Sequence, residues 1–328
     1  MNNTRLYYLD IAKGILILLL LVSHFGIVVK ESGVDVQGSY FAGIYFFHPL
    51  FTTFFMQSFF LISGYCSNFS QNARLFFYKQ LKEIVVPYMF FGIINVLFQY
   101  IHNPEYHFRI VSFWFLNALL FSKVFCWMVY RLNVTAKWYY VISIGLFLFG
   151  IILNNYDIGE NILSIRQGLT SCLFVVAGMS LRKNSNIYNY LIKYSWCLYI
   201  IIFAIIYALN QEFRIPIIDG LFRKFPLYKV PLVIIISVTG SFTVFQISRL
   251  IGRFSIVEYF GRNSLIIYCL HVIPFQSIVI LLSHIFRPYN IITGTIFYLV
   301  ALMLEMSVMV IIIKIFNYPP LKYCMGRW

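Results

Sequence analysis

The feature that most constrains this chain is a series of apolar stretches, each about as long as a bilayer is thick. A helix needs about 20 apolar residues to cross the hydrocarbon core. About ten stretches approach that length, at residues 7–29, 41–65, 84–101, 111–131, 138–154, 162–181, 190–209, 229–248, 264–286 and 291–316. Hydrophobic residues make up 61% of the chain and charged residues only 11%, too few to cover a soluble domain. The sequence therefore predicts an all-α polytopic membrane protein, a bundle of about ten transmembrane helices.

No internal repeat or extended polar tract separates these stretches, so residues 1–328 are expected to form a single integral-membrane domain. The first stretch is too long and too charged for a cleaved signal peptide. Lys and Arg are more frequent in the connecting segments on the same side of the membrane as the N-terminus than in those on the opposite side. This bias predicts a cell-membrane protein with both termini in the cytoplasm. It also explains the net charge of +14 without nucleic-acid binding.

The six cysteines form no C-x-x-C pair and show no ligand-like spacing to histidine. Most lie within apolar stretches or at their ends, where a cysteine behaves as a small hydrophobic residue. The sequence therefore predicts neither a metal site nor a disulfide framework.

Three ionisable residues lie in the first apolar stretch: Asp10, Lys13 and His24. Lys13 and His24 are eleven residues apart, which places them on one helix face about 16 Å apart along the axis. Asp10 lies one turn before Lys13 and could orient it, but is roughly 21 Å from His24 by helical rise. Because ionisable groups are expensive in a membrane, this stripe predicts a functional site.

Further polar groups lie at the ends of other stretches. Ser63, Gly64 and Tyr65 end the second stretch, where a serine–glycine pair either lets helices pack closely or admits a ligand. Asn117 lies one turn after Trp114; the tryptophan fits an interface anchor, whereas the amide needs a partner.

The ninth stretch begins with Asn263 or Ser264 as a candidate helix cap. Ser264, Tyr268 and His271 follow with i, i+4, i+7 spacing and form a polar stripe on one face. His271 fits either a site residue or a structural histidine. Glu305, mid-helix in the last stretch, fits a structural ion pair as well as a catalytic role.

An inner loop between the second and third stretches carries Arg74, Lys79 and Lys82, ahead of Pro87. Basic residues beside a membrane commonly reflect topology alone. They could also bind phosphate groups of a ligand.

Four pieces of sequence, in order, resemble the integral-membrane acyltransferase-3 family, in the branch similar to fucose 4-O-acetylase and exopolysaccharide O-acetyltransferases. They are Leu9-Asp-Ile-Ala-Lys-Gly14 followed by His24, Phe59-Phe-Leu-Ile-Ser-Gly-Tyr65, Trp114-Phe-Leu-Asn117, and Gly261-Arg-Asn-Ser-Leu-Ile-Ile-Tyr-Cys-Leu-His271. The resemblance covers nearly the whole chain. Lys13 stands where many members have arginine.

The resemblance implies transfer of an acyl group, acetyl by default, from acyl-CoA to a hydroxyl of a cell-envelope or exported glycan. It implies His24 as the catalytic residue. Acetyl-CoA is then the co-substrate and the glycan the acceptor, and other glycan-assembly proteins are candidate partners. No metal is expected.

These inferences combine into one expected site. Lys13, Arg74, Lys79 and Lys82 hold the phosphates of the donor, with Ser63, Gly64 and Tyr65 also lining its site. His24 acts as general base on the acceptor hydroxyl or takes the acyl group itself. The candidate donors to the oxyanion are Asn117, Ser264, Tyr268 and His271. Two other classes compete: a transporter or flippase of a glycan-related substrate, and a structural subunit of a glycan-assembly complex.

Overall fold

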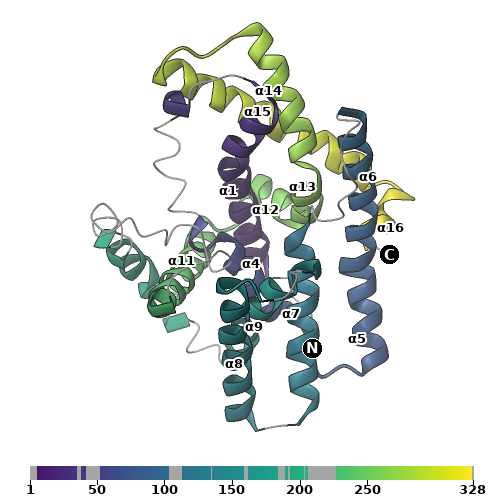
Figure 1. Cartoon of the computed structure of the whole chain (residues 1–328), viewed down its shortest axis with the longest axis vertical. Helices are drawn as coiled ribbons and strands as arrows, with labels where there is room; N and C mark the ends of the chain where they lie inside the picture. The colour runs from purple at the N-terminus through teal and green to yellow at the C-terminus, as the bar shows by residue number, and fades with distance from the viewer. Residues whose placement is uncertain are drawn as a thin grey trace.

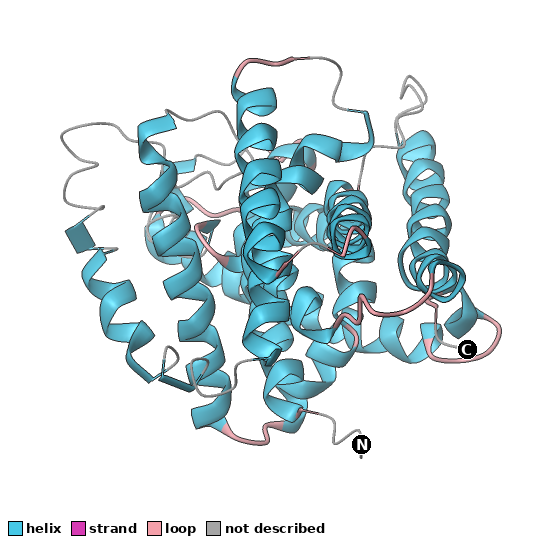
Figure 2. Ribbon diagram, turned by 90° about the horizontal axis from the view of Figure 1, so that it is seen from below, coloured by secondary structure: helices cyan, strands magenta, loops and turns pink. Residues whose placement is uncertain are grey.

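The computed structural model describes residues 6–34, 38–41, 52–102, 113–133, 135–158, 162–183, 189–190, 193–202, 204–205 and 227–326. Within these ranges every regular element is helical, with no strand (Figure 2). The longer helices are α1 (Tyr7–Glu31), α4 (Phe55–Cys66), α5 (Ala73–Gln80), α6 (Val86–His102), α7 (Trp114–Arg131), α8 (Ala136–Asn155), α9 (Ile165–Lys183), α11 (Val230–Ile251), α12 (Ser255–Arg262), α13 (Ser264–Leu270), α14 (Val272–Ile285) and α15 (Ile291–Phe316). The short elements are η1 (Gly38–Phe41), the π-helical turn η2 (Leu81–Val85), η3 (Ile162–Ser164), η5 (Leu227–Lys229) and α16 (Leu321–Cys324).

Helix α1 is the element around which the others gather (Figure 1). It contacts α4, α11, α12, α13, α14 and α15. Helices α4, α7, α8 and α9 pack together beside its N-terminal half, whereas α14 and α15 cover its C-terminal half. Residues near both ends of the chain therefore meet at α1, which brings the first and ninth apolar stretches together.

Five helices of the described residues are long and apolar enough to cross a membrane, or six if α13 and α14 count as one bent span. This supports a membrane protein, but the predicted count of ten spans is not confirmed. Helix α9 carries Arg166, Arg182 and Lys183, and α7 carries Lys123 and Arg131, which lowers their mean hydropathy. Helix α4 has only 12 residues and begins after Phe54, whose backbone is not helical; residues 42–51 of that stretch lie outside the described part.

The predicted inner loop at Arg74, Lys79 and Lys82 is helical instead. Asn72 caps α5 by accepting a hydrogen bond from the Leu75 amide at 2.9 Å. Helix α5 then continues through η2 into α6. Pro87 lacks an amide hydrogen and would normally interrupt a helix, and the π-helical turn directly before it changes the local hydrogen-bond pattern. The three basic residues therefore lie on helical structure rather than on a flexible connection.

The ninth predicted span is bent rather than straight. Helices α13 and α14 meet at His271 with a bend of 56°. Pro274 lies in the first turn of α14, where it cannot donate to the carbonyl of Leu270 and its ring crowds that carbonyl. The bend places His271 at a break between two helices.

Glycines let two pairs of these helices approach closely. A Cβ at Gly14 would overlap the backbone carbonyl of Val257, and one at Gly261 would overlap that of Asp10. Helices α1 and α12 therefore touch backbone to backbone. In the same way Gly64 packs on Val175 of α9.

Candidate active site

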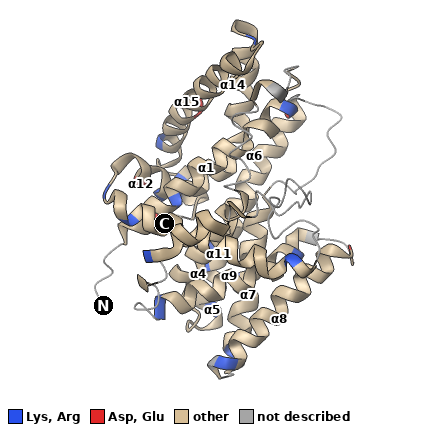
Figure 3. Cartoon of the chain, turned by 90° about the vertical axis from the view of Figure 1, so that its left-hand side faces the viewer, with Lys and Arg blue, Asp and Glu red and all other residues tan. Residues whose placement is uncertain are grey.

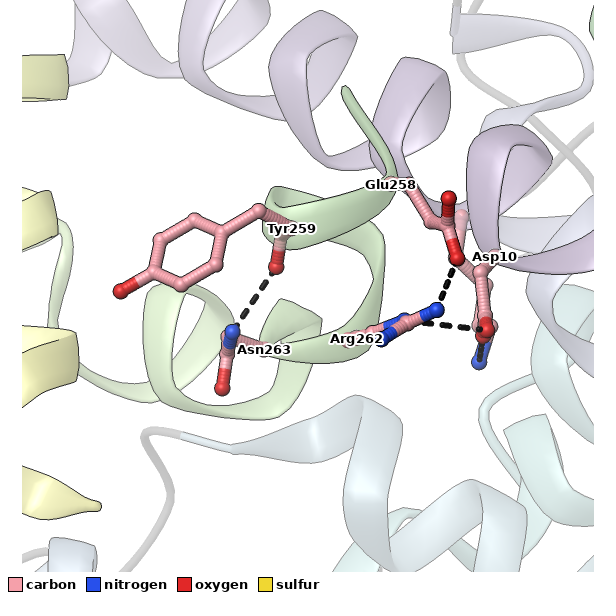
Figure 4. A network of polar contacts seen from close by, with 6 residues as sticks. Asp10, Glu258, Tyr259, Arg262 and Asn263 are labelled. Carbon is pink, nitrogen blue, oxygen red and sulfur yellow. Dashed lines mark hydrogen bonds and ion pairs between the residues drawn. The ribbon is translucent and has the colours of Figure 1, made fainter. Parts of the chain in front are cut away.

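A chain of four charged side chains lies where α1 crosses α12 (Figure 4). Lys13 Nζ lies 2.7 Å from Asp10 Oδ1, so the predicted pairing of these residues is present. Asp10 Oδ2 also lies 3.7 Å from Arg262 Nε. Arg262 in turn pairs with Glu258 one turn earlier in α12. The side chain of Asp10 is almost fully buried. It therefore links Lys13 to Arg262, which comes from the C-terminal part of the chain.

Asn263 follows this network and corrects one prediction. Its side chain does not cap the start of α13. Instead its amide donates to the carbonyl of Tyr259 at 2.8 Å, at the end of α12 (Figure 4). Its side-chain oxygen accepts from Asn317 at 3.4 Å. The residue therefore joins the end of α12 to the end of α15.

Two further arginines cover the start of α1. The guanidinium of Arg249 lies 4.8 Å from the Tyr8 ring centroid, and that of Arg253 lies 5.6 Å from the Tyr7 ring centroid. Both are cation–π distances. Figure 3 shows basic residues gathered around α12 and the first turns of α1. This end of the bundle is therefore electropositive.

A cavity of about 240 Å³ opens between α1, α4, α7 and α13. Lys13, Cys66 and Glu83 line one end of it. Tyr8 donates to the Tyr65 hydroxyl at 3.4 Å, which shows that the end of α4 lies beside the start of α1. Phe59, Phe115 and Tyr268 line the opposite, aromatic end. The cavity therefore has a charged end and an apolar, aromatic end.

Tyr268 is held at the aromatic end by its own hydroxyl. The oxygen accepts a hydrogen bond from the Phe115 amide, in the first turn of α7, at 3.3 Å. First-turn amides have no partner within their own helix, so this contact satisfies one of them. Among the described residues nothing accepts the hydroxyl proton of Tyr268. That proton is available to a ligand in the cavity.

His24 and His271 lie against each other beyond the aromatic end. Their ring centroids are 5.0 Å apart and the rings are nearly perpendicular. Nδ1 of His24 lies 3.0 Å from the Leu20 carbonyl, and Nδ1 of His271 lies 3.0 Å from the Ile267 carbonyl. Because a carbonyl oxygen only accepts, both Nδ1 atoms carry hydrogen, and a neutral ring keeps its lone pair on Nε2. His271 is 3% exposed, and its Nε2 has no hydrogen-bond partner in the described residues.

The histidine pair lies at a boundary between two hydrophobic clusters. One cluster includes Leu21 and Leu270, and the other includes Phe25 and Phe275. Each histidine therefore lies between the two clusters on its own segment. Glu305 has the same position on α15: the preceding Ala301 belongs to one cluster and the following Met309 to the other. Three polar groups thus share a layer of an otherwise apolar interior.

The remaining predicted residues divide into two groups. Ser63 and Ser264 line the cavity. Gly64 packs against α9 and Tyr65 bonds to Tyr8, so neither is among the lining residues. Asn117 is buried in α7, and its side chain forms no hydrogen bond with the described residues.

None of the basic residues of α5 and η2 lines the cavity. Lys79 Nζ lies 3.9 Å from Glu83, which does line it. Arg74 is exposed, and Lys82 is half-buried. A phosphate-binding role for these three remains a prediction.

Sequence reasoning missed two residues near the site. Arg262 is only a member of the fourth motif in the sequence, yet its side chain reaches Asp10. Lys123 is a lone lysine inside an apolar stretch and is 8% exposed. Its position within a predicted span was the available signal, because a charge there is expensive.

Within the described residues, no group of three or more His, Cys, Asp and Glu side chains lies close enough to hold a metal ion. Within the described residues the fold and the cavity define an all-helical membrane protein whose helix bundle contains a mostly apolar cavity with charged residues at one end. The sequence profile of acyltransferase family 3, described as an acyltransferase domain, matches residues 6–314. The chain therefore belongs to acyltransferase family 3. No curated protein and no solved structure gives a significant match.

Proposed function

We propose that this protein transfers an acyl group, acetyl by default, from acyl-CoA to a hydroxyl of a cell-envelope or exported glycan. Membership of the acyltransferase family supports acyl transfer in general. The observation that carries the finer proposal is the order of groups along α1 and α13. Lys13 stands at the charged end of the cavity, Tyr268 at its aromatic end, and the His24–His271 pair beyond Tyr268.

The order of these groups fits the shape of the donor. Acyl-CoA has anionic phosphates at one end, a long arm, and a thioester at the other end. Lys13 would attract the phosphates as a point charge. Asp10 fixes the position of Lys13 through their 2.7 Å contact. The apolar cavity would hold the arm, so that the thioester points toward His24, which lies about 16 Å further along the helix.

His24 supplies the base. Its Nε2 takes the proton of the acceptor hydroxyl as the hydroxyl oxygen attacks the thioester carbonyl. The carbonyl oxygen becomes an oxyanion, to which the free proton of Tyr268 is directed. Collapse of this intermediate expels the coenzyme A thiolate, which takes the proton from His24. In the second route that the sequence leaves open, Nε2 attacks the thioester first and the acceptor then attacks the acyl-imidazole.

His271 would act on His24 rather than on the substrate. A second imidazole with its lone pair on Nε2, 5.0 Å away between ring centroids, favours a protonated His24 next to it. This stabilises the imidazolium that forms during the first route. The proposal also includes a cell-membrane location with both termini cytoplasmic, where acyl-CoA is made.

The test uses purified protein in nanodiscs with radiolabelled acetyl-CoA and candidate glycan acceptors. Label should move to the glycan with the wild type and with His284→Ala, and not with His24→Ala. His284 is the matched control because its Nδ1 also bonds a carbonyl of its own helix, at 2.9 Å, on the exposed side of α14. Full transfer by well-folded His24→Ala would exclude His24 as the base. In sealed proteoliposomes, movement of glycan across the membrane without transfer would instead support the transporter alternative.

A further inference from the structure

Lys123 is the buried cation for which the proposed mechanism has no use. It lies in the middle of α7 and is 8% exposed. It forms no hydrogen bond and no ion pair within the described residues. A buried charge is expensive in a membrane protein unless something pairs with it. A bound anion would offset the free-energy cost of burying this lysine.

The position of Lys123 points to the cavity. Leu116, Leu119 and Lys123 follow i, i+3, i+7 spacing and share one face of α7. The first two line the cavity, and Lys123 lies one turn further along the same face of α7, beyond the lining residues. Lys123 lies away from the aromatic end, since Phe115 is in the first turn of α7 and bonds there to Tyr268 of α13.

The surroundings of Lys123 place it at the charged end. Glu83 and Cys66, which both line that end, lie within its electrostatic range, as does Lys79. The thiol of Cys66 lies in the field of both Lys123 and Lys13. The two lysines therefore flank the same end of the cavity, one from α7 and one from α1.

The carboxylates near these two lysines are shared with other cations. Asp10 pairs with Lys13 and also approaches Arg262. Glu83 is 3.9 Å from Lys79, and it lies beyond ion-pair distance from Lys123. Within the described residues Lys123 therefore has no ion-pair partner, and the more distant Glu83 offsets its positive charge only in part.

We propose that Lys123 binds a phosphate of the acyl-CoA donor opposite Lys13, so that two lysines on facing helices clamp the anionic end of the donor. This inference rests on the proposed use of acyl-CoA. Two point charges at one phosphate position fix the depth to which the donor enters, and hence where the thioester stops. Lys123 is then a substrate-binding residue that sets the reach of the donor arm.

The experiment measures binding rather than transfer, so it does not depend on the acceptor. Coenzyme A and pantetheine, which has the same arm but no phosphate, are titrated into the purified protein in nanodiscs. The variants are Lys123→Met, Lys123→Arg and the control Lys137→Met, an exposed lysine of α8. Lys123→Met should weaken binding of coenzyme A by about 10- to 100-fold, as expected for one charge-assisted contact. Binding of pantetheine should be unchanged, and Lys123→Arg should restore most of the affinity for coenzyme A.

The outcomes separate this inference from the proposed function. If the wild type binds coenzyme A and Lys123→Met binds it equally well, Lys123 is not a phosphate ligand and the proposed function stands. Equal losses for coenzyme A and pantetheine would mean a structural role and would also overturn the inference. If the wild type binds no coenzyme A, both proposals fail.

A second measurement uses the wild type alone and so does not require the variant to fold. Coenzyme A should protect Lys123 from an amine-reactive reagent, read by mass spectrometry, whereas pantetheine should not. Lys137 should react equally in both cases. Unchanged labelling of Lys123 in saturating coenzyme A would overturn the inference.

Discussion

Gly261 of α12 lies directly against the backbone of Gly14 of α1, with no side chain between them. This contact lets two helices from opposite ends of the chain cross at backbone distance. It brings Arg262, the next residue of α12, to Asp10 of α1. The same crossing starts α13 beside α1, so that Tyr268 reaches the cavity and His271 reaches His24.

Gly261→Ala should therefore disturb the whole site. Its Cβ would overlap the Asp10 carbonyl, which is backbone and can move only if the helices separate. We expect a loss of stability of at least about 1–3 kcal/mol, as for other overpacked interiors, together with loss of activity. Thermal unfolding in detergent measures the first effect and acyl transfer the second.

Gly145→Ala is the matched control for this substitution. Gly145 lies in the interior of α8 with nothing within 4 Å of an added Cβ. The Gly145→Ala variant should keep the stability and activity of the wild type. Equal behaviour of the two variants would show that the α1–α12 contact does not constrain the site.

Asp10→Asn keeps the shape of the side chain and removes its charge. Lys13 and Arg262 would then lose their shared carboxylate, and Lys13 would no longer be held at the cavity. Removing one partner of a buried pair costs about 3–5 kcal/mol. The cost here should be smaller, because the side chains of Lys13 and Arg262 are 27% and 46% exposed. Steady-state kinetics should show a raised KM for the donor with a smaller change in kcat.

Lys13 itself can be tested with two substitutions. Lys13→Arg keeps a cation that can reach a phosphate, whereas Lys13→Ala removes it. At limiting acyl-CoA, the arginine variant should retain much more transfer than the alanine variant. Similar rates for both would argue against a phosphate role for Lys13.

Tyr268→Phe removes the hydroxyl group that this side chain could use to donate a hydrogen bond into the aromatic end of the cavity. The ring should remain packed against Phe113 and Phe115. We expect kcat to fall by about 10- to 1,000-fold, as when one oxyanion donor is lost, with little change in donor affinity. A fall in affinity without a fall in kcat would assign the hydroxyl to binding.

His271→Gln tests whether the second histidine supports the first. Glutamine can still bond to a backbone carbonyl, but it supplies no basic nitrogen next to His24. Transfer should fall by about 100-fold or more, within the range typical of general-base assistance, while donor binding is retained. An unchanged rate of transfer would leave His271 with a structural role only.

The sequence predicted contacts between residues that are close together along the chain better than contacts between distant segments. The pairing of Asp10 with Lys13 followed from their spacing in one helix, and the stripe of Ser264, Tyr268 and His271 followed in the same way. The helical path through Arg74 and Lys79 was missed, because a basic, polar segment before a proline is also typical of a loop. The bend at His271 was missed as well, although Pro274 was visible three residues later.

The sequence by itself determined that this protein lies in a membrane and that it is built from helices. Long apolar stretches require helices in a bilayer, and periodicity fixes which side chains share a helix face. Only the tertiary structure decided which faces meet. The contacts of His24 with His271 and of Asp10 with Arg262 join residues about 250 positions apart. They exist because two glycines allow α1 and α12 to cross at backbone distance, and because α13 ends at a bend. Helical spacing carries no information about such crossings, since they arise from close packing between separate segments.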